Sequence, residues 1–458
     1  MFINKLIHLS RQDSVRKLTI WSLSILLLFL GFYVNLWHAA KPAWFESHQR
    51  DTEAHIMGRM VKSRHDGIFS AGGLNGDGII EDIPKQWESA SGLQRQYIAY
   101  LNDLSFNAFS TYNSQPGGQG MVFSLIDKLL PLPPNVKLQL FYVLTALLTA
   151  IAISAVISWF YQEFGLWIAV CVMVTTLFSG WLTVFGKNLW WSTWAFYLPM
   201  IAVLYYLKRQ REDTDLPYLR FGILVFIAIS IKCFINGYEY MTTTLVMMIV
   251  PCVYYAILDK WEKQTILKFT LATGIGSGVA IILSLIILCF QIGAIRTGFV
   301  DGVAHVIYSI GKRTYGSSEN FHPVYAASLD AGTIEVVLKY LNGVYFDLNN
   351  YLTKEIPFVS NWIFRIRYSY LIVFFIGVTV LLLLQIKQTS RSEHRQHYFA
   401  LICTTWFSIL APMSWYVIFK AHSFIHTHMS FLLWQMPFTL FGFALAASAF
   451  GKKKEMNH

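Results

Sequence analysis

The sequence predicts an all-α polytopic membrane protein with about ten transmembrane helices. The chain has 458 residues, of which 55% are hydrophobic and only 14% are charged, whereas charged residues make up about a quarter of an ordinary soluble domain. Apolar runs long enough to cross ~30 Å of bilayer hydrocarbon recur along it. We place these runs at residues 18–37, 138–160, 165–185, 189–207, 217–235, 241–258, 266–292, 368–386, 398–419 and 430–450.

The distribution of basic residues predicts that both termini are cytoplasmic. Four basic side chains precede the run at 18–37, which is too long for a signal peptide and lacks a good cleavage site, so we expect it to remain as the first span. With the N-terminus inside, the basic stretches 208–211, 260–268, 387–395 and 452–454 also fall inside. The short outer loops then hold only Lys187 and Lys420, which agrees with the positive-inside rule.

The formal net charge of +10 does not indicate a nucleic-acid partner, because the basic residues cluster at the ends of apolar runs, as topology signals do. The five cysteines all lie inside apolar runs and form no CxxC motif. Neither a disulfide framework nor a thiolate metal site is expected. We therefore expect membrane lipids around the chain, with a bacterial inner membrane as its location.

Within a single transmembrane domain (1–458), two outer segments are too long to be simple connections: residues 38–136 and 293–367. Segments of this length usually carry function or fold as small units. In the first, residues 51–64 and 121–130 read as helices lying at the membrane surface, the former with Arg59 on its polar face. The histidines, apart from four near the inner ends, also fall on the outer side, so we expect the site there.

A first polar patch is formed by Asp51, Glu53 and His55, just after the first span. A carboxylate there can act as the general base that deprotonates an acceptor hydroxyl, with His55 binding substrate. A spacing of two places Asp51 and Glu53 on different faces of a helix. The alternative is that Asp51 caps the helix and Glu53 favours its dipole.

A second patch holds Lys232, Asn236 and Glu239, near the outer end of the fifth span. Lys232 and Glu239 are seven residues apart, so a continuous helix would place them on one face. An intramembrane lysine is by default a functional candidate, here for an anionic lipid phosphate. The alternative is an internal ion pair between Lys232 and Glu239 that holds the helices together.

A third patch, in the outer turn between the last two spans, contains Lys420, His422, His426 and His428. His422 and His426 have the spacing of a helical metal site, but no outer carboxylate stands at a ligand spacing, so we favour substrate binding over zinc. Lys312 and Arg313, in the second long segment, can neutralise a phosphate or contact anionic headgroups.

These features together resemble the GT-C superfamily of membrane glycosyltransferases. The resemblance covers the layout of most of the chain, with a long first outer loop that carries two interfacial helices. It also covers Asp51-Thr52-Glu53-Ala54-His55, similar to an Asp-Glu-Ala-aromatic stretch of that family, and the 114–120 stretch Ser-Gln-Pro-Gly-Gly-Gln-Gly. In this chain Thr52 separates the two acids, so either Asp51 or Glu53 can be the counterpart of the family's acid.

The resemblance implies an inverting transfer of a sugar from a polyprenyl-phosphate-linked donor to a lipid or glycan acceptor at the periplasmic face. Asp51 or Glu53 would remove the acceptor's proton, and basic side chains would stabilise the leaving lipid phosphate. No nucleotide cofactor is expected, which agrees with the lack of a Gly-rich phosphate loop. A divalent metal is possible but not required.

Two other classes remain open. A polysaccharide polymerase or ligase that uses undecaprenyl-diphosphate glycans would share the outer site but depend on arginines and histidines. A lipid or solute transporter would perform no chemistry. The nearly uncharged inner halves of the spans and the absence of an internal repeat count against the transporter.

Overall fold

The computed structural model describes residues 2–81, 84–213, 216–348, 365–388 and 392–451. Within these ranges seven helices are long and apolar enough to cross a membrane, or eight if a bent pair near the C-terminus counts as one span. The expectation of a polytopic α-helical membrane protein is thus confirmed in outline. The spans are α1 (Phe2–Val34), α6 (Pro134–Phe164), α10 (Tyr218–Asn236), α11 (Met241–Leu258), α12 (Lys263–Ile295), α16 (Tyr368–Gln388), the pair α17 (Ser392–Ser408) and α18 (Leu410–Ile418), and the bent pair α20 (Thr427–Ser430) with η8 (Phe431–Gln435) and α21 (Phe438–Phe450).

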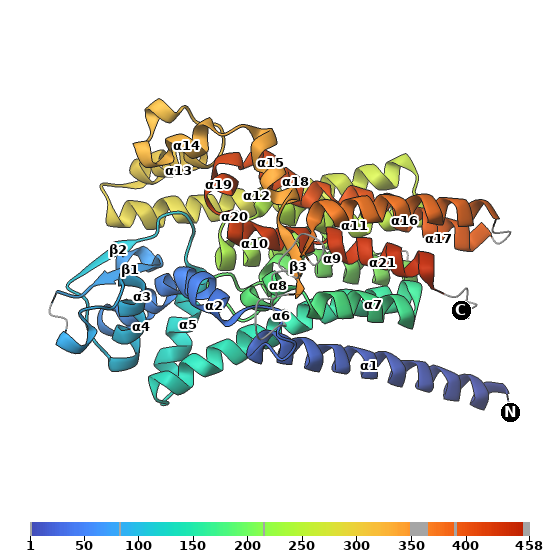
Figure 1. Ribbon diagram of the computed structural model, residues 1–458, viewed down its shortest axis with the longest axis horizontal. Helices are drawn as coiled ribbons and strands as arrows, with labels where there is room; N and C mark the ends of the chain where they lie inside the picture. Colours follow the sequence, from blue (N-terminus) through green and yellow to red (C-terminus); the bar gives the residue numbers. More distant parts are fainter. Residues whose placement is uncertain (1, 82–83, 214–215, 349–364, 389–391, 452–458) are drawn as a thin grey trace.

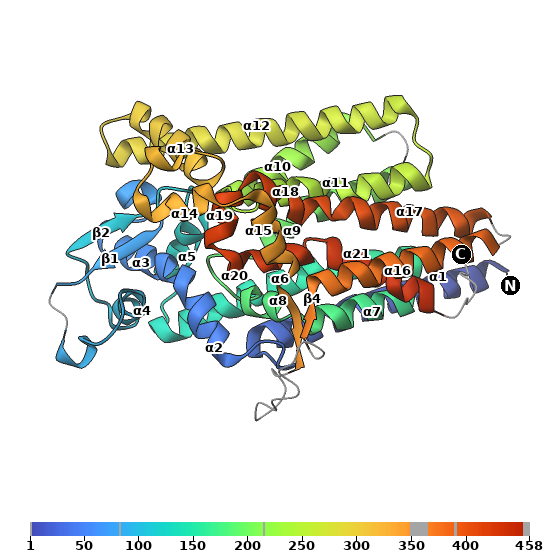
Figure 2. The same cartoon turned by 45° about the horizontal axis from the view of Figure 1, so that its top comes forward.

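The helices run side by side, and the start of α1 and the end of α21 lie at the same end of the bundle (Figure 1). The two long segments gather at the opposite end, which we call the loop end (Figures 1 and 2). Exposed apolar side chains follow one side of α12 along its length, including Ile275, Ile282 and Phe290. This exposed stripe is what a helix facing lipid requires.

Two of the ten expected spans are not long apolar helices. The run at 165–185 is divided into α7 (Leu166–Leu177) and α8 (Gly180–Phe185), where the Ser179 hydroxyl caps the second helix by accepting a bond from the Leu182 amide at 3.4 Å. The run at 189–207 forms α9 (Trp194–Glu212). This helix begins later in the chain than expected, and its last turn contains charged residues. Residues 186–193 between α8 and α9 are irregular because their polar groups bind the first long segment, as described below.

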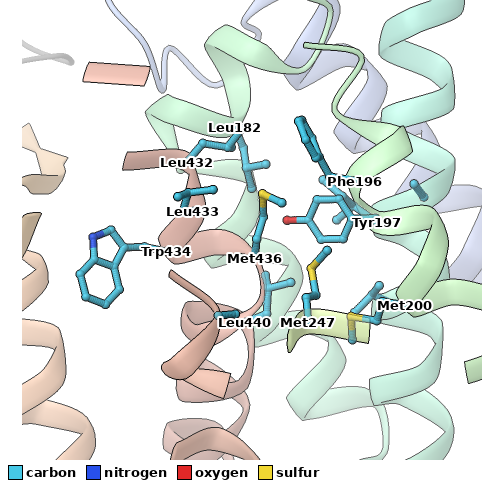
Figure 3. Packing of buried hydrophobic residues seen from close by; sticks show 14 of the residues in the cluster. Leu182, Phe196, Tyr197, Met200, Met247, Leu432, Leu433, Trp434, Met436 and Leu440 are labelled. Carbon is cyan, nitrogen blue, oxygen red and sulfur yellow. The ribbon is translucent and has the colours of Figure 1, made fainter. Parts of the chain in front are cut away.

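The core of the bundle is a continuous apolar cluster that joins distant parts of the chain. Figure 3 shows Tyr197 of α9 among the side chains of Met200, Met247 and Met436. Tyr197 is fully buried, and its hydroxyl donates to the Gln435 carbonyl at 2.8 Å. This packing places the C-terminal bent pair against α9 and α11, and the third polar patch lies at the start of this pair.

The first long segment folds as a small lobe around one helix, α3 (Arg50–Asp66). It contains an antiparallel pair of strands in which Gly76 lies opposite Thr111. Its elements are α2 (Pro42–Trp44), η1 (Phe45–Gln49), α3, η2 (Ser70–Gly73), β1 (Gly76–Ile79), η3 (Lys85–Trp87), α4 (Gly92–Asn102), β2 (Ala108–Thr111) and α5 (Gly118–Leu129).

Helix α3 is buried on most sides, so the expectation that Arg59 lies on a polar face of this helix is wrong. Arg59 is fully buried. Its guanidinium donates to the carbonyls of Gly67, Ser70 and Leu74 at 3.2, 2.6 and 3.2 Å. These hydrogen bonds replace the ones to water that the guanidinium loses on burial, and they hold the turn that follows α3.

A buried ion pair ties α3 to α5. The Arg64 guanidinium donates to both carboxylate oxygens of Asp127, at 2.7 and 2.9 Å, and Asp127 also accepts from the Tyr100 hydroxyl at 2.8 Å. The Asp127 side chain is only 2% exposed. A bidentate pair in this setting fixes the relative orientation of the two helices.

The second long segment covers the other side of the loop end. Its described elements are α13 (Phe299–Arg313), η4 (Ser318–Asn320), η5 (Pro323–Tyr325), α14 (Ala326–Asp330), α15 (Thr333–Leu341), β3 (Val344–Asp347) and β4 (Arg365–Arg367). β3 and β4 pair antiparallel, with Asp347 opposite Arg365.

Replacing Arg64 with Met should destabilise the lobe by ~3 kcal/mol, because breaking a buried ion pair leaves Asp127 without its main partner. Thermal unfolding and amide hydrogen exchange of α3 and α5 measure the change. The matched control is Lys62→Met, which removes a more exposed pair with Asp66 and should change stability by less than about 1 kcal/mol. Equal effects of the two substitutions would contradict this role of Arg64.

Candidate functional site

The start of α3 presents two carboxylates in opposite directions. The helical backbone already begins upstream, in α2 and η1, and neither Gln49 nor Asp51 makes a capping hydrogen bond. The alternative in which Asp51 caps the helix is therefore wrong. His48, Asp51 and His55 have the i, i+3, i+7 spacing of one helix face, and Glu53 lies on another.

Glu53 is fully buried, and both of its carboxyl oxygens have partners. One oxygen accepts from the Gln49 amide at 3.0 Å and from the Leu189 backbone N–H at 2.8 Å. The other accepts from the hydroxyls of Tyr97 and Tyr142, at 2.9 and 3.1 Å. Glu53 therefore joins α3 to α4, to α6 and to the irregular stretch at 186–193.

Burial raises the pKa of Glu53 to about 7, although the four hydrogen bonds act in the opposite direction. Asn188 strengthens the same junction, since its side-chain amide donates to the Gln49 carbonyl at 3.2 Å. These contacts explain why residues 186–193 are not helical.

Asp51, in contrast, is only partly buried and makes no hydrogen bond through its side chain to any residue that the structure describes. It lies close enough to His428 for their charges to interact. The His428 ring stacks on the His48 ring, with centroids 4.8 Å apart. Burial, and secondarily His428, lower the pKa of His48 to about 4, so this imidazole is neutral at pH 7.

His55 faces a different partner on the same side of α3. Its Nδ1 lies 2.9 Å from an oxygen of Asp77 on β1. Its ring stacks on Tyr112, with centroids 5.2 Å apart, and lies 5.2 Å from the ring of Trp190. His55 is thereby held between an acid and two aromatic rings, and its side chain remains 23% exposed.

Glu239, in the turn between α10 and α11, brings the second and third patches together. One of its oxygens lies 3.1 Å from Nε2 of His422, and the other lies 3.9 Å from the Arg313 guanidinium. Burial alone would raise the pKa of Glu239, but His422, Arg313 and His426 outweigh it and lower the pKa to about 2. Glu239 is therefore ionised at neutral pH.

His422 and His426 lie beside each other on α19 (Lys420–Ile425) and its C-terminal cap, with ring centroids 4.7 Å apart. Burial, together with His422, lowers the pKa of His426 to about 4, while Glu239 acts in the opposite direction. Both side chains are partly exposed, so a ligand can reach them.

Arg313 closes the connection back to α3. Besides lying near Glu239, it donates to the Tyr112 hydroxyl at 3.2 Å, and Tyr112 stacks on His55. A set of contacts and charge interactions thus runs from η1 and α3 through α20, α19, the turn before α11 and α13, and returns to α3. We call this set the polar ring: His48, Asp51, His55, Tyr112, Glu239, Arg313, His422, His426 and His428.

The remaining basic residues singled out from the sequence are bonded elsewhere. Lys232 is fully buried and donates to the backbone carbonyls of Gly237 and Glu239, at 2.8 and 2.6 Å, not to the Glu239 carboxylate. Lys420 donates to the carbonyls of Leu329 and Ala331, at 2.6 and 2.7 Å. Each lysine thus uses two of its three N–H donors on the backbone.

Lys312 points to aromatic rings, lying 4.7 Å from the centroid of Tyr325 and 5.7 Å from that of Tyr308. It neighbours Arg313 on α13. Among the described residues, no group of three or more His, Cys, Asp or Glu side chains is arranged to hold a metal ion.

Sequence reasoning missed several members of this site. His48 has the helical spacing that would have placed it beside Asp51. Tyr97 and Tyr142, in contrast, lie 44 and 89 residues from Glu53, and no local pattern marks them. Tyr112 likewise joins the polar ring only through its contacts with His55 and Arg313.

Comparison of the chain with protein-family models, curated proteins and solved structures gave no match. The function is therefore inferred from the geometry of the polar ring and from the environments of Asp51 and Glu53.

Replacing Glu53 with Gln should change how stability depends on pH. Because the pKa of Glu53 is higher in the folded state, wild type loses stability as the pH rises from 4.5 to about 7, by a few kcal/mol, with ~1.4 kcal/mol per pKa unit. Glu53→Gln removes this loss, so its unfolding midpoint should rise relative to wild type across that range.

The matched control is Glu46→Gln, which changes an exposed glutamate seven residues earlier and should leave the pH profile unchanged. Thermal unfolding between pH 4.5 and 8 measures both variants. Parallel profiles for wild type and Glu53→Gln would show that Glu53 does not titrate with a raised pKa.

Proposed function

We propose that the chain is an inverting glycosyltransferase that moves a sugar from a polyprenyl-phosphate-linked donor to a hydroxyl of a lipid or glycan acceptor. The reaction takes place at the loop end, on the periplasmic side of a bacterial inner membrane. In this reaction the acceptor oxygen forms a bond to the anomeric carbon, and the bond from that carbon to the phosphate oxygen breaks. The phosphate leaves with the bonding electrons, and the acceptor proton passes to a base.

The observation that carries the proposal is the difference between Asp51 and Glu53. Glu53 is sealed from solvent with both oxygens occupied by protein donors, so it has no room for an acceptor hydroxyl. Asp51 is partly exposed, belongs to the polar ring and is not hydrogen-bonded to any described residue. We therefore assign Asp51 as the general base and Glu53 as the residue that positions α3.

The leaving phosphate is assigned to the cationic side of the polar ring. Arg313 contributes a permanent positive charge near the ionised Glu239, and His422 contributes an imidazole N–H 3.1 Å from the same acid. Glu239 lies between both groups, and its negative charge attracts them. Lys232 and Lys420 support this side through the carbonyls that they bind.

A second candidate is a polymerase or ligase that uses undecaprenyl-diphosphate glycans. The polar ring favours it in one respect, because His48, His422, His426 and His428 together with Arg313 outnumber the single accessible acid on α3. In such an enzyme, activity would depend on Arg313 and the histidines and would survive the loss of Asp51.

Asp51→Asn should reduce sugar transfer by about 10²–10⁴-fold, the usual contribution of a general base. Folding should be unaffected, because the Asp51 side chain bonds to no described residue. The assay incubates purified protein with polyprenyl-phosphate sugars and acceptor lipid, and scores sugar transfer by mass. Glu46→Gln, at an exposed site nearby, is the control and should retain full activity.

Wild-type transfer by Asp51→Asn would remove the base assignment. If that variant also used diphosphate-linked glycans at the wild-type rate while Arg313→Met did not, the polymerase or ligase would be the better description.

A further inference from the structure

Helix α13 carries apolar side chains on its outer face and polar side chains on its inner face. Val300, Ala304 and Ile307 have the i, i+4, i+7 spacing of one helix face. Val300 is 78% exposed and Ile307 is 65% exposed, and Ala304 is exposed as well. A helix on the surface of a water-soluble protein has the opposite arrangement, with its apolar face toward the core. The outer face of α13 therefore needs a partner other than water.

The inner face of α13 is held by polar contacts. His305, Ser309 and Arg313 follow one another at intervals of four residues, so they share a face. The Ser309 hydroxyl is buried and lies 3.3 Å from Nε2 of His305. Arg313 donates to the Tyr112 hydroxyl in the polar ring. Turning α13 over to bury its apolar face would break these contacts, so they fix which face points outward.

The depth of α13 in the membrane follows from α12, on which it packs. Lys268 is the last charged residue of α12, and Cys289 lies 21 residues after it. With the helical rise per residue, this separation is ~30 Å, the thickness of the hydrocarbon core. Gly302 of α13 meets the backbone of Cys289, since a Cβ at Gly302 would lie 2.2 Å from the Cys289 carbonyl oxygen. Helix α13 thus contacts α12 where the outer edge of the hydrocarbon core is expected.

The exposed face of α13 continues the lipid-facing stripe of α12. Phe290 belongs to that stripe, and its ring lies 4.7 Å from the ring of Phe299, the first residue of α13. Both rings are exposed. Figures 1 and 2 show α13 beside the end of α12 at the loop end. One apolar surface therefore runs from the span onto α13, and the lipid that covers the span is the partner that also fits α13.

We propose that α13 is embedded in the outer leaflet of the bilayer, with Val300 and Ile307 in contact with acyl chains. Acyl chains cover an apolar helix face without any polar contact, as they do for amphipathic helices that lie in a membrane interface. Arg296, exposed just before α13, supplies a cation at the level of the headgroups.

This placement makes α13 a wall between lipid and the polar ring. Ile307 lies on the lipid side of the wall, and Arg313 lies on the side of the polar ring. The Arg313 guanidinium is thereby held near the membrane surface, where the phosphate of a lipid-linked substrate lies. That last consequence rests on the proposed function, whereas the embedding of α13 does not require the transfer reaction.

The first experiment is photocrosslinking of the full chain in nanodiscs of phosphatidylethanolamine and phosphatidylglycerol. With p-benzoylphenylalanine in place of Ile307, illumination should add the mass of a lipid to the protein. The same replacement of Ile282, on the lipid-facing stripe of α12, is the positive control. Gln86, exposed in the lobe, is the negative control. The yield of lipid adduct at Ile307 should match that at Ile282 and exceed that at Gln86 by about tenfold or more.

The second experiment is amide hydrogen exchange in the same nanodiscs. Ile307→Lys places a charge on the face that contacts acyl chains, so exchange of the α13 amides should become roughly tenfold faster. Because Ile307 is exposed in the folded chain, the substitution removes little packing against protein. Ser317→Lys is the matched control, since it adds the same charge at an exposed position just beyond α13, and it should leave exchange of α13 unchanged.

Three results would overturn the proposal. The first is a lipid adduct at Ile282 without one at Ile307. The second is a crosslink from Ile307 to another copy of the chain in place of lipid, which would assign this face to self-association. The third is equal exchange of the α13 amides in wild type and Ile307→Lys, which would show that water already covers the face. None of these results depends on whether the chain transfers sugar.

Discussion

The buried carboxyl group of Glu53 is the contact on which the loop end depends. Four donors meet it, from Gln49 on its own helix, Tyr97 on α4, Tyr142 on α6 and the backbone of Leu189. Burying this carboxyl group without hydrogen-bond partners would be strongly unfavourable. Burying the four donors without the carboxyl group to accept from them would be unfavourable as well. The lobe can therefore dock on the bundle in only one rotational setting of α3.

That setting decides the chemistry of the neighbouring acid. With Glu53 turned into the bundle, Asp51 faces His428 of α20, and His55 faces Asp77 and Tyr112 of the lobe. Asp51 and Glu53 are thus only two residues apart but have opposite environments. Hydrogen-bond donors occupy both oxygens of Glu53, whereas Asp51 is accessible to a ligand. Glu239 shows a third outcome, since His422 and Arg313 keep it ionised although it is buried.

Three buried basic residues serve folding by bonding to the backbone. Arg59, Lys232 and Lys420 are all buried, and each of them bonds to backbone carbonyls in turns where no helix partner is available. Lys232 binds the carbonyl of Glu239, so it holds the turn that directs the Glu239 side chain to the polar ring. A buried positive charge is thus not by itself evidence of an anion site. The groups to which it bonds show whether it serves folding or binding.

The sequence alone determined the class of fold, because apolar run length and charge content reflect the bilayer directly. It also indicated where polar groups concentrate, since the spacing of Asp51 and His55, and of His422 and His426, follows the helix period. Only the tertiary structure decided which of Asp51 and Glu53 has its carboxyl oxygens bonded to protein groups, because the partners of Glu53 lie up to 136 residues away. It also decided that 165–185 and 189–207 are not full spans and that Arg59 is buried, since side-chain bonds between distant segments override local pattern.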